Sequence, residues 1–335
     1  MSAETPVCQL LERQATDYRG WLWVAPPRDA WLDTTQGSLL SSDHGVIEAW
    51  RGRGRPAFDV LSSETITPPG AVLFWPKSHA LGEWWLLALC QRLPVGTALQ
   101  VVGENNGGIK RALKALAALG LGCRKLDSAR RCTLFATRLD RVALEAEHAW
   151  HLFEAEGLRL ASHPGVFGHG KLDDGTRLLL ETLPAALPNS AGEMLDLGCG
   201  DGIISAWMAR RGATLTATDI NLFAVEATRR TLVANALVGE ALPSDVYSAL
   251  GERRFDAIVS NPPFHQERAI DYGPAGRLIR EAPDHLRPGG SLIIVANAFL
   301  PYPDLLESAF GGFEILADDR RFRVYRAVRH QGRGK

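Results

Sequence analysis

The sequence predicts an α/β protein with two tandem domains, each built on a mostly parallel sheet. Three observations lead to this prediction. The chain has 335 residues, a usual length for two domains. Strand and helix patterns alternate through the C-terminal half, as they do in parallel sheets covered by helices on both faces. The N-terminal half repeats the same order of patterns at similar spacing.

The elements of the C-terminal half follow from hydrophobic periodicity and turn residues. Strands are expected at "EMLDLG", "TLTATD", "FDAIVS", "SLIIVANAF", "FEILAD" and "RFRVYRAV". Helices are expected at "ISAWMARRG", "NLFAVEATRRTLVANAL", "AGRLIREAPDHLRPGG" (closed by its Pro-Gly-Gly turn) and "PDLLESAF". Because only "DDR" separates the last two strands, they are predicted to form an antiparallel hairpin at the sheet edge.

The N-terminal half reads as a degenerate copy of this plan. "AVLFWPKS" parallels "AIVSNPPF", and "GCRKLDSARRCTLFATRL" parallels "GFEILADDRRFRVYRAV". The copy has no glycine-rich loop after its early strand "WLWVAPP", and no asparagine precedes Trp75. An internal duplication that lost its chemistry explains this, although α/β domains also share a general likeness. The predicted domains are 1–156 and 157–335, with a loop in the second leading to a helix near Asp174.

Composition sets limits on the class of protein. Hydrophobic residues make up 46% and the formal net charge is −1, so any nucleic-acid binding must come from local patches. The five cysteines lack CxxC spacing, which predicts a reducing cytosol and neither disulfides nor a metal site. The N-terminus does not read as a signal peptide, and "WWLLALC" is far shorter than the roughly 20 residues of a membrane span.

A glycine-rich loop, "LDLGCGDG", follows the first strand of the second domain and precedes a helix. Gly198 permits a tight turn, Gly200 lets a ligand approach the backbone, and Gly202 lets the helix pack close to the sheet. The third glycine of a dinucleotide fingerprint would be residue 203, which is Ile203. An acidic residue, Asp196, stands before the loop instead, and a second, Asp219, ends the next strand.

This combination resembles the Rossmann-like methyltransferases that bind S-adenosylmethionine. The resemblance implies that the loop surrounds the methionine part of the cofactor and that Asp219 holds the ribose hydroxyls. It further implies that Asp245 and Val246 flank the adenine. The cofactor-binding residues expected on this basis are Asp196, Gly198, Cys199, Gly200, Gly202, Asp219, Ile220, Asp245, Val246 and Asn261, with Phe167 closing over the cofactor.

The motif "SNPPFH" follows the strand expected beside the first strand, so it should lie next to the cofactor's methyl group. Asn-Pro-Pro-Phe resembles the motif of enzymes that methylate amino groups conjugated to a π-system. The Asn261 side-chain oxygen and the Pro262 carbonyl are the expected acceptors for the N–H groups of such an amine. Pro262 and Pro263 fix the backbone, and Phe264 offers a ring for stacking. These four are the expected catalytic residues.

The motif alone does not choose between a nucleobase and a glutamine amide. The whole chain resembles the bacterial 16S ribosomal RNA guanine-N2 methyltransferase family known as RsmC, through "LPVGTALQVVGENNGG", "KLDSARRC", "PGVF", "LDLGCGDG", "SNPPFH" and "VANAFLPYP". Its members have two tandem methyltransferase-like domains with seven-stranded sheets, the first without a cofactor site. The resemblance implies methylation of guanine N2, with 16S ribosomal RNA or the 30S subunit as partner, in a cytoplasmic and monomeric protein.

Contact with RNA needs local positive charge and stacking surfaces. The candidate residues are Phe264, His265, Arg277, Arg280, Arg321 and Arg323. The alternatives are a solvated edge hairpin for the last two arginines and a structural role for the histidine. At the level of function, an adenine-N6 or protein glutamine-N5 methyltransferase remains open, as does an RNA-binding assembly factor without catalysis.

Overall fold

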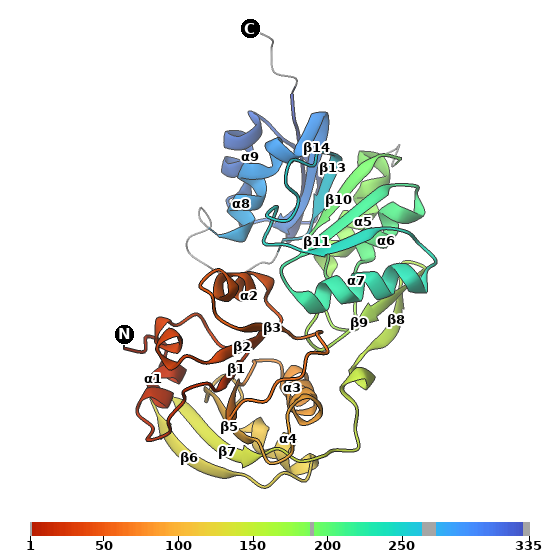
Figure 1. The fold of residues 1–335 in the computed structure, drawn as a ribbon. Coiled ribbons are helices and arrows are strands. Elements are labelled where there is room, and N and C mark those ends of the chain that lie inside the picture. Colours follow the sequence, from red (N-terminus) through yellow and green to blue (C-terminus); the bar gives the residue numbers. More distant parts are fainter. Residues whose placement is uncertain (1, 188–190, 263–272, 331–335) are drawn as a thin grey trace. The chain divides into compact units, whose positions relative to one another are not determined.

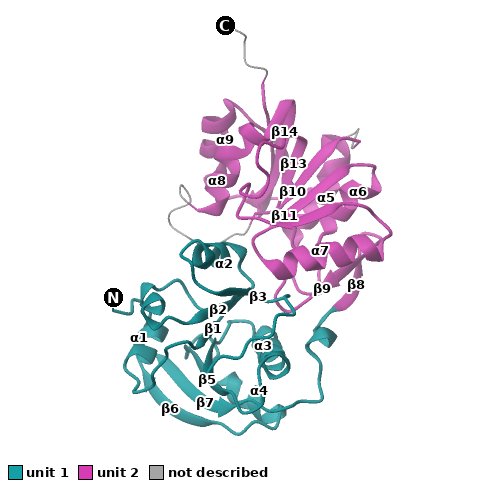
Figure 2. Ribbon diagram, viewed as in Figure 1, with its two compact units in different colours: residues 1–150 teal, residues 151–335 magenta. Residues whose placement is uncertain are grey.

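The computed structural model describes residues 2–187, 191–262 and 273–330 (Figure 1). The chain divides into two compact units, residues 1–150 and 151–335 (Figure 2). The expected boundary at 156/157 falls in the turn between β8 (His151–Ala155) and β9 (Leu158–Ser162). These strands pair with each other, and β9 packs against α7 (Leu222–Ala234), so both belong to unit 2.

Unit 1 contains one sheet with helices between its strands. Its elements in chain order are α1 (Pro6–Glu12), β1 (Leu22–Val24), η1 (Ala30–Thr35), β2 (Ser38–Ser41), α2 (His44–Arg51), β3 (Ala57–Asp59), β4 (Gly70–Phe74), α3 (His79–Arg92), β5 (Ala98–Glu104), α4 (Arg111–Ala118), β6 (Arg124–Ala129), β7 (Cys132–Arg138) and η2 (Ala146–Ala149).

Unit 2 continues with the same alternation after its opening hairpin. Its further elements are α5 (Asp174–Ala186), β10 (Glu193–Leu197), α6 (Ile203–Arg210), β11 (Thr214–Asp219), β12 (Glu240–Pro243), β13 (Phe255–Ser260), α8 (Pro274–Glu281), η3 (Ala282–His285), β14 (Leu286–Asn297), α9 (Tyr302–Phe310), β15 (Glu314–Asp318) and β16 (Phe322–Val328). The helix expected to close with a Pro-Gly-Gly turn is wrong at its end: α8 stops at Glu281, η3 follows, and "RPGG" already belongs to β14.

The two units share one strand order. The seven-stranded sheets run β3-β2-β1-β4-β5-β7-β6 and β12-β11-β10-β13-β14-β16-β15. In each sheet one strand, β7 or β16, runs antiparallel to both of its neighbours. Both edge hairpins also carry a register shift at the same place, between Lys125 and Asp127 and between Ile315 and Ala317. Because bulges are retained within families, this shared irregularity supports duplication over a general likeness of α/β domains.

The core of unit 2 lies on both faces of its sheet, because the strand side chains alternate. Val259 and Ile293 pack on one face with α5 and α6. Ile258 and Leu292 pack on the other with α8 and α9. Figure 1 shows these helix pairs on opposite sides of the sheet. None of the helices in the described ranges is both long and apolar enough to cross a bilayer.

The loop after β1 in unit 1 keeps a trace of the glycine turn. The Ala25 amide donates to the Leu40 carbonyl at 2.9 Å, as the Gly198 amide donates to the Thr218 carbonyl at 2.8 Å in unit 2. Ala25 even keeps a positive φ of 51°, which an alanine adopts only with strain. The first residue after β1 and the first residue after β10 therefore have the same backbone conformation and the same hydrogen bond.

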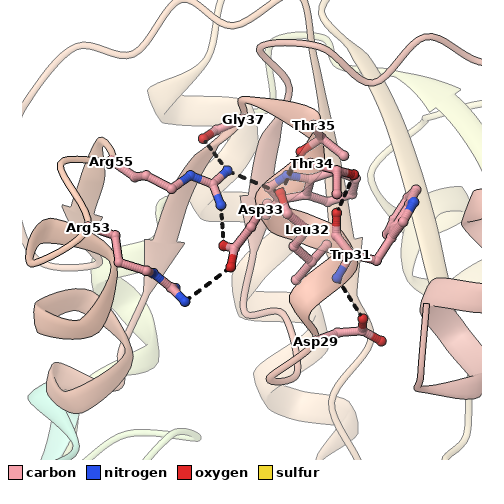
Figure 3. Close-up of polar contacts among 10 residues, drawn as sticks. Asp29, Trp31, Leu32, Asp33, Thr34, Thr35, Gly37, Arg53 and Arg55 are labelled. Carbon is pink, nitrogen blue, oxygen red and sulfur yellow. Dashed lines mark hydrogen bonds and ion pairs between the residues drawn. The ribbon is translucent and has the colours of Figure 1, made fainter. Parts of the chain in front are cut away.

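Polar contacts of side chains hold the segment that follows this loop in unit 1 (Figure 3). Asp33 forms ion pairs with Arg53, at 3.1 Å, and with Arg55, and Arg55 also donates to the carbonyl oxygens of Leu32 and Gly37. These contacts hold a 3₁₀ helix, η1, where unit 2 has the cofactor-loop helix α6. Trp75, buried to 8% exposure, follows β4 as Asn261 follows β13.

Candidate active site

The ends of three neighbouring strands bring the predicted motifs together. β10 pairs in parallel with β11 on one side and with β13 on the other. The glycine loop, Asp219 and Asn261 follow these strands, so they meet at one edge of the sheet, as the sequence predicted. The Ser260 hydroxyl donates to the Leu197 carbonyl at 2.6 Å and joins two of the strand ends directly.

The three loop glycines serve different purposes. Gly198, Gly200 and Gly202 all have positive φ, at 80°, 55° and 84°. A Cβ added at Gly198 or Gly200 would meet no heavy atom within 4 Å, so the backbone there faces open space. A Cβ at Gly202 would lie 2.9 Å from Thr228 Cα. Gly202 therefore allows α6 to approach α7, not the sheet as the sequence suggested.

Three carboxylates surround this loop, and burial raises the pKa of each. The pKa of Asp196 rises to about 7 and that of Asp201 to about 6, and the pKa of Asp219 is also raised. Ser205 Oγ donates to Asp196 Oδ2 at 2.5 Å, while Asp196 Oδ1 is buried without a hydrogen-bond partner among the described residues. Within the described part of the chain, no basic side chain forms an ion pair with any of the three.

Such a site fits a ligand that brings its own positive charge. S-adenosylmethionine carries an ammonium and a sulfonium group, and the buried, unsatisfied carboxylate oxygen of Asp196 lies beside open backbone. Burying a carboxylate without a partner is costly, so a cationic ligand relieves an existing cost. The buried carboxylates and the open backbone at the glycines therefore fit this cofactor.

Asp219 is fixed by the backbone on either side. Its Oδ2 accepts from the Gly200 amide at 3.1 Å, and its Oδ1 accepts from the Asn221 amide at 2.9 Å. Each oxygen retains a second acceptor position for a ribose hydroxyl. The Asn221 side chain donates to the Gly165 carbonyl at 2.7 Å and so attaches the "PGVF" loop to the end of β11. Sequence reasoning missed Asn221, whose only signal was its position as helix N-cap.

The expected adenine side carries a feature that the sequence did not reveal. Val246 has a φ of 54°, a left-handed conformation that is strained for a β-branched residue. Asp245 forms an ion pair with Arg277, and each side chain is about one-third exposed. Arg277, expected at the RNA, thus contacts a residue expected at the cofactor.

Asn261 is held by two residues of α5 and its cap. Its Nδ2 donates to Thr176 Oγ1 at 2.7 Å and lies 3.3 Å from Asp173 Oδ2. The Thr176 hydroxyl in turn donates to Asp173, which also caps α5 through the Gly175 amide at 3.0 Å. Asn261 Oδ1 is buried and has no hydrogen-bond partner among the described residues.

Sequence reasoning missed Asp173 and Thr176 as site residues. Their spacing indicates a helix N-cap, and the expected start of the helix near Asp174 is confirmed. Their contact with an amide 88 and 85 residues further along could not be inferred from that pattern.

The other predicted residues are placed as follows. Pro262 is buried, whereas Pro263, Phe264 and His265 lie outside the described residues. Cys199 is buried, Ile220 is half-buried and Phe167 is 72% exposed. Arg280 is exposed on α8. Arg321 and Arg323 form ion pairs with Asp174 and Asp318, each at 2.7 Å.

The fold and this site define a methyltransferase. Residues 157–326 match the family model "Methyltransferase small domain", and residues 8–152 match "Methyltransferase small domain N-terminal". The chain is 68% identical to ribosomal RNA small subunit methyltransferase C of Chromohalobacter salexigens, over 98% of this chain and 99% of that protein. It is 44% identical to the Escherichia coli K12 protein of the same name, over 98% of both chains. The chain belongs to the ribosomal RNA small subunit methyltransferase C family.

A solved structure agrees with this family over both units. The 16S rRNA N2 G1207 methyltransferase of Thermus thermophilus, in complex with AdoMet and guanosine, superposes with a TM-score of 0.86 at 29% identity. The match covers 98% of this chain and 92% of that one. The expected fold of two tandem methyltransferase domains is confirmed.

Proposed function

We propose that this protein transfers a methyl group from S-adenosylmethionine to the exocyclic N2 amine of a specific guanosine in 16S ribosomal RNA. The reaction takes place in unit 2, and unit 1 holds no cofactor. The observation that carries this proposal is the buried Asn261 Oδ1, an acceptor at the end of β13 that has no hydrogen-bond partner among the described residues. Similarity to the 16S rRNA N2 G1207 methyltransferase of Thermus thermophilus supports the guanine over other amines.

When bound, S-adenosylmethionine supplies a methyl group activated by the positive charge of its sulfur. The chain's own residues bind and orient it. Gly198 and Gly200 leave room for close approach of the ligand to the backbone, and Asp196 offers a carboxylate oxygen to its ammonium group. Asp219 takes the ribose hydroxyls, and Asp245 with Val246 lies beside the adenine.

Asn261 acts on the incoming amine. The lone pair of guanine N2 is delocalised into the ring, so the nitrogen is a weak nucleophile. Asn261 Oδ1 and the Pro262 carbonyl accept its two N–H bonds, which favours a pyramidal nitrogen and stabilises the positive charge that develops on it. The product nitrogen then loses a proton readily, and no strong base is required. Pro263 and Phe264 complete the motif, with the ring as a stacking surface for the base.

The remaining part of the proposal concerns contact with the RNA. Arg277, Arg280, Arg321 and Arg323 are the proposed contacts for phosphates, and His265, which lies outside the described residues, is a further candidate from the sequence. The substrate is ribosomal RNA in the 30S subunit or before its assembly, and the protein works as a monomer in the cytoplasm. Metal ions take no part in the proposed chemistry.

The test is methylation with labelled cofactor. Purified protein is incubated with 30S particles or 16S RNA from cells that lack the modification, and the RNA is digested to nucleosides. The expected product is N2-methylguanosine. Label in N6-methyladenosine or in protein would contradict the guanine assignment, and binding of RNA without any label would favour an assembly factor.

The role of the amide is tested with Asn261→Ala. Because Asn261 acts on the amine, this variant should keep its cofactor affinity and lose turnover by a factor of about 100 or more. Arg254→Ala, an exposed change on the same unit before β13, is the matched control and should keep full turnover. Unchanged turnover in Asn261→Ala would rule out the proposed role.

A further inference from the structure

Two residues outside the motif determine which way the Asn261 amide faces. The Thr176 hydroxyl has one hydrogen, and it is donated to Asp173. Thr176 Oγ1 can therefore only accept from Asn261, at 2.7 Å, so the group facing it must be the NH₂. If the amide were reversed, its oxygen would also face Asp173 Oδ2, which now lies 3.3 Å from Asn261 Nδ2. Two acceptor oxygens would then face each other.

The surroundings make this arrangement rigid. Thr176 is buried at 6% exposure in the first turn of α5, and Asp173 is the cap of that helix. Asp173 accepts from the amides of Gly175 and Thr176, at 3.0 and 3.2 Å, which holds its carboxylate in one orientation. The direction of hydrogen bonding therefore runs from the Asn261 NH₂ to the Thr176 hydroxyl and on to the Asp173 carboxylate.

We infer that Asp173 and Thr176 are positioning residues that hold the Asn261 amide with its oxygen toward the amine to be methylated. The inference rests on the proposed methyl transfer and deepens it. The amide oxygen is left buried and without a partner among the described residues. A buried acceptor without a partner is costly, and the Asp173–Thr176 pair keeps the amide from turning that oxygen elsewhere. The site is thus arranged in advance for an N–H donor.

Replacement of Thr176 by valine tests the inference, because valine keeps the shape and loses the hydroxyl. We expect kcat to fall about 10- to 100-fold, since misplacement of a catalytic group by about 1 Å has effects of this size. KM for RNA and the affinity for S-adenosylmethionine should stay within about twofold. Thr176→Ser restores the hydroxyl and should restore most of kcat.

A matched control separates this role from helix stability. Thr182 lies on the same helix, and its hydroxyl donates to the Leu178 carbonyl of that helix at 2.7 Å. Thr182→Val should leave kcat unchanged. In an Asn261→Ala background, Thr176→Val should cost no further activity, because the residue it positions is gone. Additive losses in that double variant would overturn the inference.

A spectroscopic measurement keeps the inference independent of the substrate. The Asn261 NH₂ protons should exchange slowly with solvent in the 15N spectrum of the full chain, identified by their loss in Asn261→Asp. We expect this slow signal to persist in Thr176→Ser and to exchange rapidly in Thr176→Val. Slow exchange in both variants would overturn the positioning role, whereas absence of N2-methylguanosine with the wild type would overturn only the proposed function.

Discussion

The Ser260 hydroxyl and the Leu197 carbonyl are joined by a 2.6 Å hydrogen bond at the ends of β13 and β10. Ser260 is fully buried and directly precedes Asn261. Leu197 directly precedes Gly198, the first glycine of the cofactor loop. This bond adds to the pairing of β10 with β13 and joins the backbone before Gly198 to the residue before Asn261.

Ser260→Ala should loosen this link. Loss of the donor leaves a buried carbonyl with one partner fewer, and we expect the free energy of unfolding to fall by about 1–2 kcal/mol. Turnover should fall as well, because Asn261 is less well placed relative to the cofactor. Urea titration and single-turnover methylation measure the two effects. Ser291→Ala, at a buried serine on the neighbouring strand β14, is the control, and equal turnover losses in both variants would contradict the link.

Alanine at Gly198 and at Gly202 should fail in different ways. Gly198→Ala places a methyl group in open space, and Ala25 holds the equivalent backbone position in unit 1 with positive φ. We expect this variant to fold, with a loss of about 1 kcal/mol and cofactor affinity reduced at least about tenfold. Gly202→Ala brings a Cβ within 2.9 Å of Thr228 Cα and should lose about 2–4 kcal/mol of stability. Calorimetry of cofactor binding and thermal unfolding distinguish the two outcomes. Similar stability for the two variants would contradict the different surroundings of the two glycines.

Asp196 should make the cofactor-free protein less stable as pH rises. Burial raises the pKa of this carboxyl to about 7 in the folded state, against about 3.9 in an unfolded chain. The folded state thus binds more protons between these values, so the stability that is complete below pH 4 is lost as pH rises through 7. The raised pKa values of Asp201 and Asp219 contribute to the same trend. Asp196→Asn should therefore reduce this dependence, without removing it, in urea titrations at pH 5, 6, 7 and 8. Asp284→Asn, which removes an exposed carboxyl in η3, should leave the pH dependence of stability unchanged.

The same carboxyl should couple cofactor binding to pH. The ammonium group of S-adenosylmethionine prefers the ionised form of Asp196, so affinity should rise from pH 5 to pH 8 and binding should release protons. Calorimetry in two buffers of different ionisation enthalpy measures the release. Proton uptake, or an affinity in the wild type as independent of pH as in Asp196→Asn, would speak against a carboxylate–ammonium contact.

Arg277→Gln separates two roles for one arginine. If its ion pair with Asp245 serves the cofactor side, affinity for S-adenosylmethionine should fall a few-fold without RNA present. Because the pair is partly exposed, stability should change by less than about 1 kcal/mol. If Arg277 instead contacts a phosphate, cofactor affinity stays constant and the salt dependence of RNA binding becomes shallower by about one charge. Arg280→Gln, on the same helix, provides the comparison.

Local patterns were enough to predict most of the fold. Hydrophobic periodicity located β10, β11, β13, β14, β15 and β16, but not the hairpin of β8 and β9. The similarity of the two halves predicted two sheets of one topology, which the strand orders confirm. The error at "RPGG" has a physical reason. Pro288 and Gly289 indicate a turn locally, but backbone bonds between Gly289 and Arg329 and between Arg329 and Gly290 extend the sheet through them. Pairing with a distant strand outweighed local propensity.

The sequence by itself determined the glycine loop, the acidic strand ends and the Asn-Pro-Pro-Phe motif, because each is a short pattern whose residue types follow from backbone geometry or ligand chemistry. Only the tertiary structure decided that Gly202 faces α7 and that Arg277 pairs with Asp245. It alone placed Asp173 and Thr176 against Asn261, 88 and 85 residues away. The orientation of that amide is a property of packing between α5 and the end of β13, and no local pattern encodes a contact between such distant segments.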